Sequence, residues 1–329
     1  MIRKNIKRLT FTLIFVGTAL GVSACSPKNN WQDESSLGDI EERDIEESEE
    51  QSTKTESFKE GSKNSLIESL SQETSKEETV SSNINLTGKY YYDLLTDDEK
   101  GIYEKIYLLG SNFQKELDLS DLNINEATFC KVWASFNYDN PELFWCNNLA
   151  YNSFNDKIMN ISFYIQEDIK EKSEKVSNEM TKIISNTPQN SNNYEKAKYF
   201  YDYLIDNTTY AKEEYIGNTI DTVLLNKEAN SEGLARTFKA LCDSVNINCV
   251  YAKALKDDTS FSLNLINIDN NWYWIDITNG KLLENKGDYF CISDEEINKI
   301  YKIDTGIKVV IDRFEDVFIY PNCSITFKP

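Results

Sequence analysis

The segment from residue 231 to residue 245 carries the helical pattern around which the chain is organised. Apolar residues recur there every three or four positions, which predicts an amphipathic helix with one face buried in a core. We expect this helix to begin at Ser231. Its apolar positions are Leu234, Phe238, Leu241 and Val245.

Three apolar segments rich in β-favouring residues follow this helix. They span residues 249–255, 261–268 and 272–278. The last two are separated by the turn-forming sequence DNN at 269–271. The pattern therefore predicts a helix, a strand and a β-hairpin, in that order.

The region before Ser231 predicts further helices and one more hairpin. Thr96 and Glu99 have the spacing of a capping box, and residues 149–165 alternate around a turn at Asn155-Asp156. Large aromatic side chains dominate interior packing, so we expect those of this region in the core, and the lining of a groove is the alternative. The apolar stripes of the predicted helices are Ile102, Ile106, Leu109 and Phe113; Phe129, Val132, Trp133 and Phe136; Ile169, Val176, Met180 and Ile183; and Ala197, Phe200, Tyr201 and Leu204.

The order of these elements and several of their residues resemble the transglutaminase-like superfamily, a papain-like group. In bacterial members a Cys opens the central helix in a VCEGYAKAF-like motif, a His begins the motif HAWN, and an Asp lies in a W-Y-x-x-D-x-T strand. This sequence has NSEGLARTF at 230–238, FSLN at 261–264 and WYWIDIT at 272–278. The likeness to clostridial-type secreted members extends over most of residues 87–323.

The resemblance implies an α+β fold with a papain-like, transglutaminase-like core, in which the central helix packs on an antiparallel sheet. We expect an N-terminal helical subdomain with a hairpin at 87–190, and the core with its C-terminal tail at 191–329. In that tail, Ser293 and Glu296 predict a second capping box on a short helix.

The chemistry of the family does not carry over to this sequence. Ser231 stands at the nucleophile position and Phe261 at the base position, and only Asp276 keeps its family identity. The sequence contains 0 His, so the imidazole that a Ser or Cys nucleophile needs is missing. We therefore expect a pseudoenzyme. A Ser-Lys arrangement of Ser231 with Lys227 or Lys253 is the alternative.

The motifs also suggest which residues line the former active site. We expect Glu232, Asn264 and Trp274 in a cleft beside Ser231 and Phe261. The Asp276 carboxylate has a structural interpretation, in which it accepts hydrogen bonds from the backbone or from an indole N–H.

Residues 1–25 have the pattern of a bacterial lipoprotein signal peptide. A basic start is followed by an apolar run at 9–22, and VSAC at 22–25 matches a lipobox. The resemblance to such signals implies cleavage before Cys25 and a diacylglyceryl thioether, with palmitate-type chains, on its sulfur. We expect the protein at the extracytoplasmic face of the bacterial cell membrane, and an ordinary secretory signal is the alternative.

Residues 26–86 predict a disordered acidic tether. This segment is rich in Ser, Glu, Lys, Thr and Asn, and its 16 acidic and 6 basic residues give a net charge of −10, within −20 for the whole chain. Such acidity argues against nucleic acid as a partner and is compatible with a cationic component of the cell wall.

The cysteines suggest neither a metal site nor a fixed disulfide pattern. Of the seven, six follow Cys25, and their 15 possible pairings stay open. With no C-x-x-C and no His, we expect no metal and no cofactor. Cys242 and Cys249 are interpreted as small buried hydrophobic residues. The six are Cys130, Cys146, Cys242, Cys249, Cys291 and Cys323.

Two functions of different class are compatible with this sequence. The first is a membrane-anchored envelope lipoprotein that binds a peptide, a cell-wall component or a partner protein without turnover. The second is a divergent hydrolase or acyltransferase that uses Ser231 as its nucleophile. A stabilising subunit of an envelope complex is a variant of the first.

Overall fold

The computed structural model describes residues 14–16, 85–213, 215–310, 313–316 and 318–327. Cys25 and the predicted tether up to residue 84 lie outside these ranges. The described residues from Leu86 onward belong to one compact unit. A three-residue strand, β1 (Ile14–Val16), pairs antiparallel with β3 of this unit.

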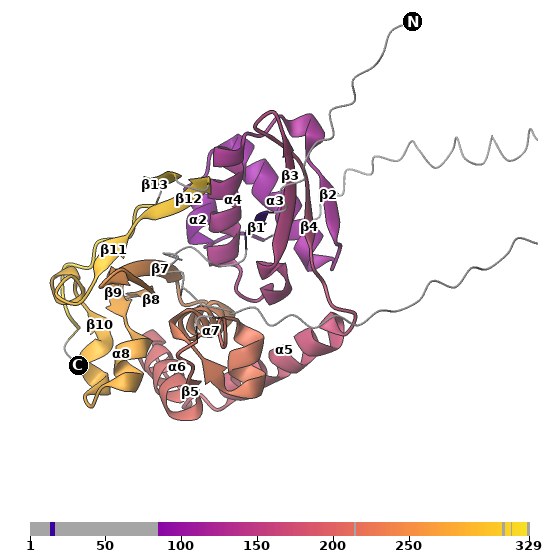
Figure 1. Ribbon diagram of the computed structural model, residues 1–329. Coiled ribbons are helices and arrows are strands. Elements are labelled where there is room, and N and C mark those ends of the chain that lie inside the picture. Colours follow the sequence, from indigo (N-terminus) through magenta and orange to yellow (C-terminus); the bar gives the residue numbers. More distant parts are fainter. Residues whose placement is uncertain (1–13, 17–84, 214, 311–312, 317, 328–329) are drawn as a thin grey trace, which may run out of the picture. The chain divides into compact units, whose positions relative to one another are not determined.

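The first part of the unit joins helices to a small antiparallel sheet (Figure 1). Both halves of the predicted capping box at Thr96 and Glu99 are present, and the hairpin turn falls at Asn155 and Asp156 as predicted. The sheet order is β1-β3-β4-β2. The elements are α2 (Tyr90–Asp93), α3 (Asp97–Ser111), β2 (Glu116–Asp118), α4 (Glu126–Asp139), β3 (Leu149–Phe154) and β4 (Lys157–Phe163).

The predicted apolar stripes of these helices are buried, with one exception. The aromatic residues of α4 lie in the core, which confirms the prediction made for them. Phe113 lies beyond the end of α3, in a left-handed conformation, and stacks on Trp145. The helical pattern therefore overran the helix by two residues, since Ser111 is its last residue.

Two long helices connect this part to the central unit. They are α5 (Ile169–Ser185) and α6 (Asn193–Asn207). Asn192 caps α6 through a second reciprocal capping box with Glu195. Short segments follow, namely β5 (Thr209–Tyr210), a π-helical turn η3 (Thr222–Asn226) and β6 (Glu228–Ala229), and β5 pairs parallel with β6.

The predicted helix, strand and hairpin form the centre of the fold. Helix α7 (Ser231–Ser244) is followed by β7 (Cys249–Lys256), β8 (Thr259–Ile268) and β9 (Asn271–Ile275). Asp269 and Asn270 both have positive φ, as a tight two-residue hairpin turn requires. The five-stranded sheet has the order β10-β9-β8-β7-β11, with antiparallel neighbours. Helix α7 packs on β7 and β8, with α6 beside it (Figure 1).

The C-terminal elements supply the two edge strands of this sheet, β10 and β11, and a separate two-stranded sheet formed by β12 and β13. These C-terminal elements are α8 (Ile277–Leu282), η4 (Lys286–Tyr289), β10 (Phe290–Ile292), α9 (Asp294–Ile297), β11 (Lys302–Asp304), β12 (Gly306–Val310) and β13 (Arg313–Asp316). The chain therefore has the predicted α+β fold, in which a central helix packs on an antiparallel sheet.

Two predicted details of this region are wrong. The strand expected over 272–278 ends at Ile275, because the Asp276 side chain caps a short helix, α8. The second capping box is only half formed. Ser293 Oγ accepts from the Glu296 N–H, but the Ser293 N–H donates to Thr326 Oγ1 rather than to Glu296.

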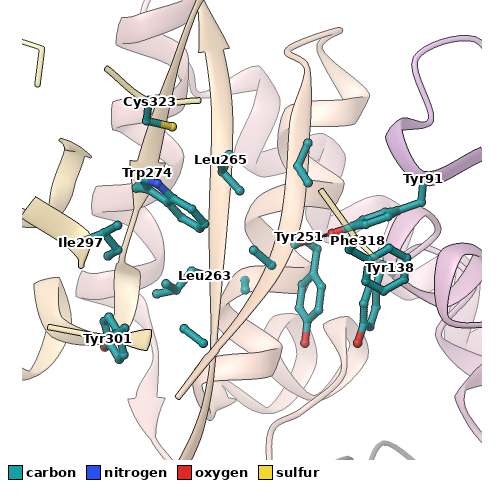
Figure 2. Packing of buried hydrophobic residues seen from close by; sticks show 14 of the residues in the cluster. Tyr91, Tyr138, Tyr251, Leu263, Leu265, Trp274, Ile297, Tyr301, Phe318 and Cys323 are labelled. Atoms are coloured by element: carbon teal, nitrogen blue, oxygen red, sulfur yellow. Dashed lines mark hydrogen bonds between the residues drawn. The ribbon is translucent and has the colours of Figure 1, made fainter. Parts of the chain in front are cut away.

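One hydrophobic cluster links the N-terminal helices to the sheet. Figure 2 shows Tyr91, Tyr138 and Phe318 gathered around Tyr251 of β7. The Tyr91 hydroxyl donates to the Tyr251 carbonyl oxygen. Residues far apart in the sequence thus share a single core, and this core fixes α4 next to β7.

Candidate functional site

The head of α7 is held by its cap and by a close approach of the backbone. Asn230 Oδ1 accepts from the Gly233 N–H at 3.0 Å, and the Asn230 N–H donates to the Gly217 carbonyl oxygen at 3.0 Å. A Cβ atom on Gly233 would lie 1.8 Å from that same carbonyl oxygen. Glycine is therefore required at this point of the helix, and Ser231 is placed at its first turn.

Ser231 is buried, with 9% of its surface exposed. Within the described residues its hydroxyl makes no hydrogen bond, so none of them accepts its proton in this arrangement. The two lysines considered as bases interact elsewhere. Lys227 Nζ contacts the Tyr203 hydroxyl at 3.4 Å, and Lys253 Nζ lies 5.7 Å from the centre of the Tyr251 ring.

Asp276 is fully buried and acts as a helix cap. Its Oδ1 accepts from the Asn279 N–H at 2.9 Å, and its Oδ2 accepts from Asn279 Nδ2 at 2.7 Å. Burial raises the pKa of Asp276, while the bonds from Asn279 and Tyr301 act in the opposite direction. The prediction that this carboxylate accepts a hydrogen bond from the backbone is therefore confirmed. The indole N–H of Trp274 donates instead to Asp294 Oδ1, at 2.7 Å.

The register of β8 decides which residues face α7. Asn264 Nδ2 donates to the Ala235 carbonyl oxygen of α7 at 3.0 Å, so Asn264 points toward that helix. Side chains alternate along a strand, hence Ser262 shares this face and Phe261 points to the other. The Phe261 ring is partly buried and lies 5.5 Å from the Tyr301 ring.

Two residues predicted to line one cleft with Ser231 therefore lie on the opposite face of the sheet. Trp274 pairs across the sheet with Leu265, on the face away from α7, and it is 2% exposed in the core. Phe261 shares that face. Both residues lie in the strands expected from the sequence, β8 and β9, but strand alternation places them on the face opposite Asn264.

A buried polar cluster occupies the face toward α7. Glu232 Oε1 accepts from Arg236 Nε at 3.0 Å and from Nη2 at 2.9 Å, and Arg236 Nη1 donates to the Asn137 carbonyl oxygen at 3.0 Å. The guanidinium lies 5.2 Å from the centre of the Tyr251 ring. The Tyr251 hydroxyl is 2.7 Å from Ser262 Oγ.

Sequence reasoning found Glu232 but missed Arg236, Tyr138 and Tyr251. Arg236 was missed because a charged residue in an amphipathic helix is normally assigned to the solvent face. The available signal was the i,i+4 spacing of Glu232 and Arg236, which lets the pair be buried together.

The cysteines do not provide a nucleophile. All six in the described residues are buried, and no two of them form a disulfide. Burial raises the pKa of Cys130 to about 12 and also raises the pKa of Cys242. Cys242 and Cys249 are both fully inside the core, which confirms their interpretation as buried hydrophobic residues.

Other site types find little support in the described residues. No group of three or more metal-ligating side chains comes together there. None of the described helices has the length and apolarity needed to cross a membrane. A hollow of about 490 Å³ lies on the β2–β4–β3 face and has acidic and amide residues in its lining, including Glu116, Asp118 and Asn160.

Comparison with known proteins bears on the central unit. The family model of the transglutaminase-like superfamily matches residues 178–279, a stretch that contains Ser231, Phe261 and Asp276. Residues 178–279 form a transglutaminase-like domain. This domain runs from the second half of α5 to the start of α8 and contains α6, α7 and the strands β7 to β9, and its fold is the papain-like α+β fold.

The chain is similar to a structure called "a TGase", with 15% identity, a TM-score of 0.29, and coverage of 40% of this chain and 44% of that one. It is also similar to "a Putative Cysteine Protease" from Cytophaga hutchinsonii, with 14% identity, a TM-score of 0.28, and coverage of 40% and 61%. The chain thus spans less than two thirds of either structure. No curated protein matches it.

Proposed function

We propose that this protein is an extracytoplasmic, membrane-anchored lipoprotein whose transglutaminase-like domain binds a peptide, a cell-wall component or a partner protein without turnover. The observation that carries the proposal is the surroundings of Ser231. This hydroxyl stands at the nucleophile position of the motif, in a chain with 0 His, and has no hydrogen-bond partner among the described residues. A serine without a proton acceptor is a poor nucleophile.

The Asp276 position supports the same proposal. In a catalytic triad the carboxylate orients the base, and here there is no imidazole to orient. The carboxylate instead bonds Asn279 and begins α8. Loss of the base from such a unit typically costs several orders of magnitude in rate.

The test of inactivity uses the full chain, purified in detergent. We expect no hydrolysis or cross-linking of peptides and no adduct between Ser231 and a serine-directed phosphonate, with mass spectrometry as the readout. Ser244→Ala, at the other end of α7, is the matched control for Ser231→Ala. Turnover or labelling that is lost in Ser231→Ala and kept in Ser244→Ala would establish the divergent hydrolase instead.

The anchor is tested separately, because it rests on the sequence VSAC at 22–25. We expect cells fed an alkyne analogue of palmitate to label the protein, and Cys25→Ala to remove both the label and the membrane association. Cys323→Ala, which changes a buried thiol, is expected to keep the label. Unchanged labelling of Cys25→Ala would refute lipidation at this residue.

A further inference from the structure

Lys253 is a largely buried lysine without a counter-ion among the described residues. Its residue is 7% exposed, yet its ammonium makes no hydrogen bond or ion pair with any described residue. Its contact within the cluster is with the Tyr251 ring, at 5.7 Å. A lysine with so much of its side chain buried is normally paired with a carboxylate, and here no described carboxylate neutralises the charge.

Tyr138 of α4 is a second incomplete group beside it. It is 4% exposed, and its hydroxyl has no partner among the described residues and is closed off from solvent. Its ring lies 4.8 Å from the Tyr251 ring, and Figure 2 shows the two hydroxyls pointing the same way. Burial raises the pKa of Tyr138, and the charge of Lys253 acts against this rise, which places the two groups within electrostatic reach.

The remaining charges of this cluster are already matched. Glu232 and Arg236 neutralise each other, and the guanidinium donates further to Asn137. Lys253 is therefore the one uncompensated charge of the cluster formed by the described residues Tyr138, Glu232, Arg236, Tyr251 and Lys253. The Tyr138 hydroxyl is closed off from solvent, whereas Lys253 Nζ is not. The ammonium can therefore be reached from solvent.

Both incomplete groups are donors and both need an acceptor. They lie on the face of the sheet that α7 covers, because Lys253 pairs across the sheet with Ser262, and the Tyr138 ring packs on Tyr251 of the same face. One ammonium and one hydroxyl match a singly charged group with two acceptor oxygens. A phosphate typically requires Arg clusters or several backbone N–H groups, and a net charge of −20 disfavours polyanions.

We propose that Lys253 binds a carboxylate of a peptide ligand, with the Tyr138 hydroxyl as the second donor. The flexible four-carbon stem of Lys253 lets the ammonium move toward the first carboxylate oxygen, which opens the way for the second oxygen to reach Tyr138. The inference rests on the proposed binding function and names the chemical group that is recognised.

The first test uses acetate as the probe and the full chain in detergent. Ligand binding to the native state raises Tm in proportion to the logarithm of ligand concentration. We expect acetate to raise Tm above that in chloride of equal ionic strength for the wild type and for Lys175→Met, which removes an exposed charge. Lys253→Met is expected to lose this difference, and an equal acetate effect in Lys253→Met would overturn the proposal.

The second test separates the two sources of a peptide carboxylate. Three fluorescein-labelled alanine pentapeptides are compared by anisotropy, one with a free C-terminus, one amidated, and one amidated with an internal Glu. We expect one carboxylate peptide or both to bind at least about tenfold more tightly than the amidated control, and Lys253→Met to remove that advantage. Equal affinity of all three peptides would refute carboxylate recognition.

Two variants guard against misfolding and against an error in the proposed function. Lys253→Met keeps an apolar stem of similar length and removes only the unpaired ammonium, so its Tm without acetate should be no lower than that of the wild type. Tyr138→Phe should keep the fold and weaken carboxylate binding, and unchanged binding would remove Tyr138 from the site. Turnover at Ser231 would contradict the pseudoenzyme proposal and leave the acetate result intact, so the two failures can be told apart.

Discussion

Asp139 is a buried carboxylate at the end of α4 that holds the first helix in place. Its oxygens accept from the backbone N–H groups of Tyr91 at 3.2 Å and Tyr92 at 2.8 Å, and from the Tyr103 hydroxyl at 3.2 Å. Its carbonyl oxygen accepts from Lys89 Nζ at 2.8 Å. A single residue thus fastens α2 and α3 to α4.

The titration of Asp139 predicts how stability depends on pH. Burial raises its pKa from 3.8 to about 6, while the nearby Lys239 and Lys89 charges and the Tyr92 and Tyr91 amides act against the rise. The native state therefore binds this proton more tightly than the unfolded chain. Its stabilising contribution is complete below about pH 4 and is lost as pH rises through about 6.

We predict that Asp139→Asn, which cannot titrate, gains stability relative to the wild type as pH rises from 4 to 7. The gain is at most about 1.4 kcal/mol for each pH unit between the two pKa values. Urea unfolding of both proteins at pH 4, 5, 6 and 7 measures the difference. A difference that stays constant with pH would show that Asp139 is not the titrating group.

At the residue scale, some properties could be predicted from the sequence and others could not. The helix start at Ser231 and the strand that carries Phe261 could be predicted from the apolar pattern and the motif spacing. The unpaired state of Lys253 and Tyr138 could not, because it depends on which side chains of α4 and β7 meet across 115 positions of sequence. Long-range contacts of this kind leave no local periodic signal.

At the scale of the secondary-structure elements, two helical glycines differ in whether a larger side chain would fit. A Cβ atom on Gly233 of α7 would lie 1.8 Å from the Gly217 carbonyl oxygen and 2.8 Å from Val223 Cγ2. A Cβ atom on Gly101 of α3 would have nothing within 4 Å. Alanine normally stabilises a helix interior by about 1 kcal/mol relative to glycine.

We therefore predict that Gly101→Ala raises the free energy of unfolding by about 1 kcal/mol and that Gly233→Ala lowers it. The clash at Gly233 involves backbone, which cannot turn aside as a flexible side chain would. Denaturant unfolding of the two variants beside the wild type gives both values. Stabilisation by Gly233→Ala would mean that the loop bearing Gly217 does not lie against α7.

The elements themselves were largely predictable. Helix α7, strands β7 and β8 and the hairpin turn at 269–271 follow the apolar pattern closely. The end of β9 was not predictable from that pattern, because Asp276 suits both a strand and a helix cap, and its bonds to Asn279 decide for the cap. The face of Phe261 likewise required the register with β7.

In the molecule as a whole, the thiols report on the integrity of the fold. All six cysteines in the described part of the chain are buried and none is joined to another in a disulfide, and the reactive form of a thiol is its thiolate. Burial raises the pKa of Cys130 to about 12 and raises the pKa of Cys146, Cys291 and Cys323 as well.

We predict that iodoacetamide at pH 8 leaves these six cysteines unmodified in the native protein and modifies all of them in 6 M guanidinium chloride. Mass spectrometry of peptides counts the modified sites and sets Cys25 apart. Rapid modification of any one of the six without denaturant would show that this part of the core opens to solvent.

The docking of α2 has a mechanical consequence. The chain enters the compact unit at Leu86, and five residues later Tyr91 is fully buried against β7, with the neighbouring backbone clasped by Asp139. A force applied to the chain before Leu86 would therefore act on contacts in the core and not on contacts at the surface. Such a force would first separate Tyr91 from β7. The contact that resists the force and the polar cluster around Tyr251 therefore lie on the same strand.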